Sequence, residues 1–199
     1  IKNINNQRKL NFLIEKYMSL LEKIFNNKIF SIFILFIFIT IIQEPSFRLF
    51  SAEIHYIGEG LQKILNIFPN KYSSYYQYES FISYRLIFDI IVSIIYQFTN
   101  DILLTANLGR VFLALLFTYS IYHFSKSLNI NLITVLAAIS SFMLMNQQLV
   151  GGEKIFGNGF QSSALSYSLL ILSISFFLRD NIIKSFLCIL LSIYFHFLI

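Results

Sequence analysis

The chain has 199 residues, of which 56% are hydrophobic and 13% are charged, and its formal net charge is +5 at pH 7. A soluble domain carries roughly 25% charged residues, so this composition excludes a soluble globular protein, which would lack the polar surface to cover itself. The apolar runs are long enough to cross a bilayer, which takes ~20 residues per helix. We therefore expect an all-α fold, a polytopic transmembrane helix bundle that forms one domain over residues 1–199.

The basic residues concentrate near the N-terminus. Residues 1–28 hold six Lys and Arg against two Glu, which gives this segment a net charge of +4. Apolar residues recur at helical spacing over residues 7–27, which predicts an amphipathic helix on the membrane surface. A basic segment before a first span also predicts a cytoplasmic N-terminus in the cytoplasmic membrane. Because no aromatic or glycine-rich pattern accompanies the charge, the bilayer is the expected partner and nucleic acid is not.

The apolar segments predict about six spans joined by short links. These segments are residues 29–42, 81–98, 103–125, 132–148, 161–178 and 182–199. The longest region between spans, residues 44–80, predicts an outer loop that carries an interfacial helix over residues 49–68. We expect the chain to be a fragment, because it begins at Ile1 and ends at Ile199 inside an apolar run.

The charged residues of the links allow two topologies. Strict alternation of six spans places Lys126, Arg179 and Lys184 outside, against the positive-inside rule. If residues 81–98 do not cross the membrane, these cations face the cytoplasm. The glycine-rich segment 151–160 then shares the outer side with the long loop.

Arg85, Asp89 and Arg110 lie well inside predicted spans, where an uncompensated charge is costly. Arg85 and Asp89 are four residues apart on one helical face, which predicts a structural ion pair or, alternatively, the polar wall of a cavity. Arg110 has no acid near it in the sequence. It either snorkels to the surface, or it binds a partner carboxylate or an anionic group such as a lipid-linked phosphate, which its planar guanidinium suits.

A glycine-rich segment interrupts the apolar runs. Residues 151–160 hold four of the seven glycines, beginning with Gly151-Gly152-Glu153-Lys154. A polar loop of this kind is tolerated at membrane depth only where protein or a water-filled cavity surrounds it. The segment therefore predicts either the lining of a site or a simple turn between helices.

His196 lies in the last predicted span, between two phenylalanines. We expect the last two spans to form an antiparallel hairpin, which would place His196 beside the glycine-rich segment with Glu153 as its partner. The alternative partner is a backbone carbonyl or a serine such as Ser163 or Ser166. No spacing of ligands for a metal ion is present, and no cofactor motif is found.

The order of these parts resembles the GT-C superfamily of membrane glycosyltransferases, in which a long acidic outer loop follows the first span. Arg110, near the start of the third span, matches an arginine of that superfamily. The resemblance implies transfer of a sugar from a polyprenyl-phosphate donor at the outer face of a bacterial membrane. It implies Glu44 or Glu53 as general base for the acceptor hydroxyl, and Arg110 at the donor phosphate.

The second half is similar to a group of uncharacterised bacterial polytopic proteins that have a Gly-Gly-Glu loop and an aromatic–His–aromatic motif. The matching residues are Gly151-Gly152-Glu153, Ala164-Leu165-Ser166-Tyr167 and Phe195-His196-Phe197. The candidate substrate-binding residues are therefore Arg110, Gly151, Gly152, Glu153, Lys154 and His196.

Two other functions stay open. An exopolysaccharide or O-antigen polymerase has a similar order of loop and spans, although Gln161-Ser162-Ser163 stands here where that class has an arginine. A non-catalytic or transporter-like membrane protein is the other alternative. A transferase needs the outer-loop acid and Arg110 to converge on one cavity, whereas a non-catalytic protein would leave Glu44 and Glu53 in water and Arg110 paired or snorkelling.

Overall fold

The computed structural model describes residues 16–17, 19, 27–42, 49, 51–67, 85–144 and 159–195. Every regular element in these ranges is an α-helix, which confirms the all-α prediction. The helices are α2 (Lys28–Ile42), α3 (Ser51–Leu65), α4 (Leu86–Thr99), α5 (Ile102–Ser127), α6 (Leu132–Leu144), α7 (Ser162–Phe177) and α8 (Ile182–Phe195).

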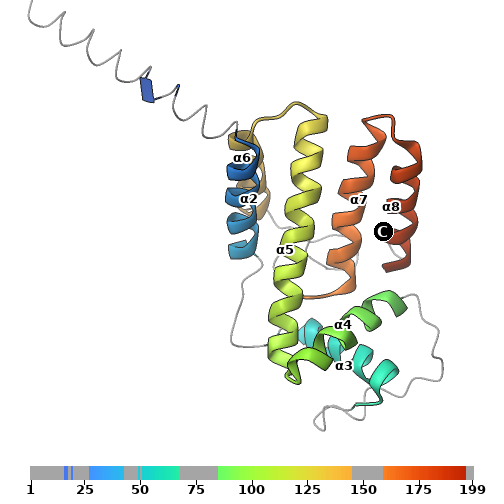
Figure 1. Ribbon diagram of the computed structural model, residues 1–199. Helices are drawn as coiled ribbons and strands as arrows, with labels where there is room; N and C mark the ends of the chain where they lie inside the picture. Colours follow the sequence, from blue (N-terminus) through green and yellow to red (C-terminus); the bar gives the residue numbers. More distant parts are fainter. Residues whose placement is uncertain are drawn as a thin grey trace, which may run out of the picture.

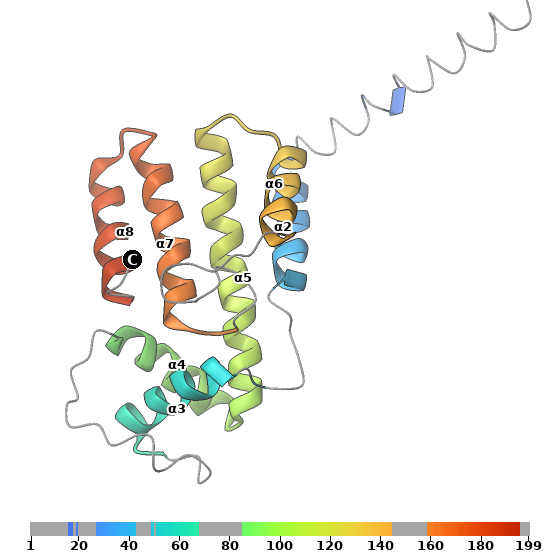
Figure 2. The same cartoon turned by 180° about the vertical axis from the view of Figure 1, so that it is seen from behind.

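Helix α5 is the central element of the molecule. Helices α2, α6, α7 and α8 run alongside the upper part of α5, while α3 and α4 lie across its lower end (Figures 1 and 2). Contacts between elements follow this arrangement, since α5 packs on α2, α4 and α7, and α3 packs mainly on α4. The molecule therefore has a bundle of roughly parallel helices and, at one end, a separate pair that we call the α3–α4 layer.

Among the described residues, only α5 is both long and apolar enough to cross a membrane, with 26 residues. The other predicted spans do form apolar helices, but these have 13 to 16 residues. A bundle of six spans is therefore not confirmed. The segment predicted as a span over 81–98 contributes α4, which lies with α3 rather than alongside the bundle.

Polar residues set the ends of these helices. Asn100 adopts a left-handed conformation (φ 50°) that ends α4, and the Asp101 side chain accepts a hydrogen bond from the Leu104 amide at 2.7 Å to begin α5. Asn129 and Asp180 take similar positive φ angles in the turns after α5 and α7. Asparagine and aspartate tolerate this conformation better than apolar residues, so each break in the apolar pattern falls at a residue suited to it.

Helices α7 and α8 form the expected hairpin, and serines join them. The Ser166 and Ser192 hydroxyls lie 2.9 Å apart, and the Ser192 hydroxyl also donates to the Ser166 carbonyl at 2.9 Å. Nearer the turn, the Ser173 hydroxyl donates to the Ser185 carbonyl at 2.9 Å. Small residues with hydroxyl groups allow close helix packing in an apolar environment. His196, which continues α8 in the sequence, lies outside the described residues.

Candidate functional site

A buried ion pair joins the α3–α4 layer to the bundle. Glu53, in the first turn of α3, and Arg110, in α5, are both fully buried. The Arg110 Nε donates to Glu53 Oε1 at 2.7 Å, and its Nη2 contacts Oε2, so the pair is bidentate. The third guanidinium nitrogen donates to Asn107 Oδ1 at 3.0 Å. The proposal that Arg110 snorkels is therefore wrong, and its partner is a carboxylate 57 residues away in the sequence.

The residues just before α7 complete this cluster. The Phe160 amide donates to Glu53 Oε1 at 2.6 Å. Gly159 has φ +82°, and a Cβ added there would lie 2.2 Å from the Glu53 Cδ. A Cβ on Gly109 would lie 2.1 Å from the Phe160 ring. Two glycines thus provide the space in which Glu53, Arg110 and Phe160 meet, and we call these five residues the Glu53 clasp.

Of the predicted site residues, the structure describes two and brings them together. Glu53 and Arg110 form the centre of the clasp. The remaining candidates, Glu44, Gly151, Gly152, Glu153, Lys154 and His196, lie outside the described residues. Glu53 is buried beside Arg110 and is not left in water, which agrees with the transferase hypothesis. Arg110 is paired with a carboxylate of the protein, which agrees with the non-catalytic hypothesis.

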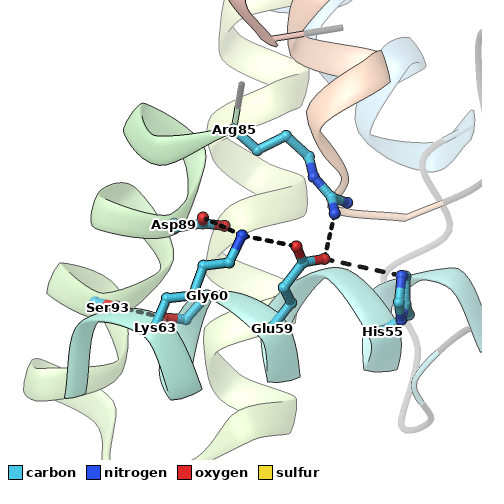
Figure 3. A network of polar contacts seen from close by, with 7 residues as sticks. All are labelled: His55, Glu59, Gly60, Lys63, Arg85, Asp89 and Ser93. Atoms are coloured by element: carbon cyan, nitrogen blue, oxygen red, sulfur yellow. Dashed lines mark hydrogen bonds and ion pairs between the residues drawn. The ribbon is translucent and has the colours of Figure 1, made fainter. Parts of the chain in front are cut away.

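A second charge cluster holds the α3–α4 layer together (Figure 3). Glu59 accepts a hydrogen bond from Lys63 Nζ at 2.9 Å and pairs with Arg85, while Lys63 also lies 3.7 Å from Asp89. These four side chains are nearly inaccessible to solvent, whereas His55, 3.8 Å from Glu59, is 51% exposed. Two acids and two bases balance within this cluster, which we call the Glu59 network.

The predicted ion pair between Arg85 and Asp89 is replaced by pairs with the neighbouring helix. Arg85 is the cap residue before α4 (φ −113°, ψ 14°), and its carbonyl accepts a hydrogen bond from the Asp89 amide at 2.9 Å, but its guanidinium contacts Glu59 on α3. Helix α3 approaches instead, because Gly60 lacks a side chain: a Cβ there would lie 3.1 Å from the Asp89 Cα. The sequence signal that was overlooked is Glu59-Gly60 followed by Lys63, an acid and a base one turn apart beside a glycine.

The opposite end of the bundle is basic. The Arg179 Nη2 donates to the His123 carbonyl at 3.1 Å, Lys184 lies 5.7 Å from the Phe176 ring that packs against His123, and Lys28 begins α2 at the same end. Lys126 follows one turn after His123 on α5. From Arg110 to Lys126 the helix rises ~24 Å at 1.5 Å per residue. The basic end therefore lies most of a bilayer thickness away from the Glu53 clasp.

In chemical terms, the buried carboxylates Glu53, Glu59 and Asp89 are all paired with cations. Glu53 accepts bonds from three donors, two on Arg110 and one on Phe160. A general base must reach the proton that it takes. Both oxygens of Glu53 instead accept hydrogen bonds from Arg110 and Phe160. No group of His, Cys, Asp and Glu within the described ranges could hold a metal ion. Comparisons with known protein families, curated proteins and solved structures found no match for this chain.

Proposed function

We propose that the chain is an integral protein of the cytoplasmic membrane, with its basic end in the cytoplasm and the α3–α4 layer at the outer face. The grouping of Lys28, Lys126, Arg179 and Lys184 at one end of the bundle supports this orientation, because cytoplasmic ends carry an excess of Lys and Arg. The N-terminus, which leads into Lys28, is then cytoplasmic. This choice selects the topology in which residues 81–98 do not cross.

Reporter fusions test the orientation. Fusions after residues 5 and 129 should report the cytoplasm, and a fusion after residue 60 should report the outer side. Residue 129 is the informative position, since strict alternation of six spans places it outside. An outer location for residue 129 together with a cytoplasmic residue 5 would contradict the proposed topology.

Within this membrane protein, we propose that the outer end transfers a sugar from a polyprenyl-phosphate donor, as the resemblance to GT-C glycosyltransferases implies. The observation that carries the proposal is the convergence of Glu53, Arg110 and Phe160 from three distant segments on one buried point. A transferase requires an outer-loop acid and a cation to come together, and here the two are in direct contact in the buried interface between α3, α5 and the start of α7. The resemblance to GT-C enzymes involves two of these segments, the outer loop and the start of the third span.

The bonds of the clasp modify the roles that the resemblance implies. Because both oxygens of Glu53 accept hydrogen bonds from the protein, we assign it as a positioning residue that fixes α3, α5 and the start of α7 relative to one another. Glu44 is then the candidate base that takes the proton of the acceptor hydroxyl.

The alternative is a non-catalytic membrane protein, and one observation favours it. Every charge of the Glu53 clasp and the Glu59 network has a partner within the protein. Buried pairs of this kind also occur in structural roles, where they fix the packing of helices.

A transfer assay distinguishes the two functions. The intact protein in lipid nanodiscs is supplied with a polyprenyl phosphate carrying a radiolabelled sugar and with a hydroxyl-bearing glycan acceptor, and transfer of the label to the acceptor is measured together with release of free polyprenyl phosphate. We expect Glu44→Gln to lower the rate by about 100-fold or more without changing thermal stability, as loss of a general base does. Lys126→Gln, at the basic end, is the control and should keep the rate. No release above background by the folded wild type would favour the non-catalytic alternative.

A further inference from the structure

The cap residue and the first turn of α7 contain three buried polar side chains whose donor atoms have no partner in the described part of the chain. These atoms are the Gln161 Nε2 and the hydroxyls of Ser162 and Ser163. The residues are at most 1% exposed, so water does not satisfy them. Leaving one buried polar group unsatisfied costs about 1–3 kcal/mol. Three such groups in consecutive residues are therefore a costly feature for a purely structural turn.

Other serines of the same helix show that this is not a general property of α7. Ser166 and Ser173 bond across the hairpin to α8, and the Ser168 hydroxyl donates to the Leu165 carbonyl at 2.7 Å. Ser175 also lacks a partner among the described residues, but it is a single residue near the C-terminal end of the helix. Within the described part of α7, unsatisfied donors are grouped only at the N-terminus.

The position of these donors indicates the charge of a ligand. The first turn of a helix leaves four backbone amides without intrahelical partners and carries the positive end of the helix dipole. The cap residue Gln161 makes no side-chain bond to these amides. Side chains in a first turn tilt toward the N-terminus, which is also the direction in which the unpaired amides of that turn point. Every group there can donate, which suits an anion with several acceptor oxygens.

The neighbouring residue already binds an anion. The Phe160 amide, immediately before Gln161, donates to the Glu53 carboxylate, whose charge Arg110 compensates. Because that pair is neutral, a second anion at the first turn of α7 meets a local field set mainly by the helix dipole. Serine hydroxyls and helix N-terminal amides are common phosphate ligands.

We propose that Gln161, Ser162 and Ser163, with the amides of the first turn of α7, form a phosphate-binding subsite. The assignment of its ligand rests on the function proposed above, under which the phosphate is that of the polyprenyl-phosphate donor. The subsite replaces Arg110 in this role, since the guanidinium of Arg110 is bonded to Glu53 and Asn107.

The test compares Ser162 and Ser163, whose hydroxyls have no hydrogen-bond partner in the described part of the chain, with Ser173 of the same helix, whose hydroxyl bonds to α8. Polyprenyl phosphate is titrated into the intact protein in detergent, and affinity and thermal stability are measured. We expect the double variant Ser162→Ala, Ser163→Ala to lose affinity by about tenfold or more, as two charge-assisted hydrogen bonds are removed. Its Tm without ligand should stay the same or rise, because two unsatisfied groups are gone. The control Ser173→Ala should lower the Tm slightly and keep the affinity.

The outcomes separate the subsite from the proposed function. An affinity of the double variant within twofold of the wild type overturns the subsite, whether or not the wild type transfers sugar. Lost affinity in the double variant, with no transfer by the wild type, supports the subsite and overturns the function. Inorganic phosphate, titrated in parallel, distinguishes the sources: equal affinity for it overturns the assignment to a lipid-linked donor while supporting a phosphate site.

Discussion

Two helix pairs in this molecule are joined by different chemistry. In the α3–α4 layer, Glu59 and Asp89 are paired with Lys63 and Arg85, and all four charges are buried. In the α7–α8 hairpin, two pairs of serines bond hydroxyl to hydroxyl and hydroxyl to carbonyl, and no charged residue takes part in these bonds. Both pairs of helices pack closely: α3 approaches α4 at Gly60, and α7 approaches α8 at their serines.

The difference follows from what each pair faces. The hairpin exposes a face of large apolar residues on α8, including Ile183 and Phe186, which suits contact with lipid. Hydroxyl bonds need no compensating charge there, and each can be lost at a modest cost. The α3–α4 layer lies at the end of the bundle, where His55 is half exposed. A charge network is tolerated at such a place only as a balanced set, because removing one partner leaves a buried charge.

The largest expected effect is at the Glu53 clasp, which ties the charged layer to the bundle. Arg110→Met leaves the carboxylate of Glu53 buried without its cation, and we expect a loss of about 3–5 kcal/mol in the free energy of unfolding. The double variant Glu53→Gln, Arg110→Met removes both charges, and its new side-chain amide oxygen can still accept from the Phe160 amide. Unfolding in SDS, followed by far-UV circular dichroism, should show that the double variant recovers most of the loss. A double variant less stable than Arg110→Met would contradict this account.

The helices of this fold could be predicted, because the signal for them is local. Every predicted apolar segment overlaps a helix of the structure, and the segment over 49–68 contains α3. The C-terminal ends of three helices were also predicted: α4, α5 and α7 end within two residues of the predicted bounds 98, 125 and 178, just before Asn100, Asn129 and Asp180, which adopt positive φ. Local polar residues thus override apolar character at helix ends.

The candidate site was predicted only in its parts. The residues near Arg110 in the sequence suggested no partner for it; only the resemblance to GT-C enzymes brought it together with an outer-loop acid, and the partner is Glu53, which lies 57 residues earlier. The error at Arg85 has the same origin, since spacing within one segment suggested Asp89, whereas packing of α3 on α4 supplies Glu59. Pairing between helices depends on which faces meet, and in this layer Gly60 determines that.

An intermediate effect is expected within the Glu59 network. Glu59→Gln removes the acceptor that Lys63 and Arg85 share, and we expect a loss of about 2 kcal/mol, less than at the clasp because Lys63 keeps Asp89. Adding Arg85→Gln restores the charge balance and should recover at least half of this loss. The control His55→Ala, at an exposed position, should change stability by less than about 0.5 kcal/mol. Equal losses in His55→Ala and Glu59→Gln would show that the network contributes no more than a surface pair.

The smallest effect is expected in the α7–α8 hairpin. Ser173→Ala removes one interhelical hydroxyl, and we expect a loss of about 0.6 kcal/mol, the average for such bonds within membranes. Ser168→Ala is the matched control on the same helix, because its hydroxyl bonds to the Leu165 carbonyl of its own helix and not to α8. The double variant Ser173→Ala, Ser185→Ala should cost less than twice the single one, since the two hydroxyls lie 3.0 Å apart and share a bond. SDS unfolding of these variants gives the measurement. If Ser173→Ala proved as costly as Arg110→Met, the hairpin would depend on its polar bonds as strongly as the charged layer does, and the distinction between the two pairs would not hold.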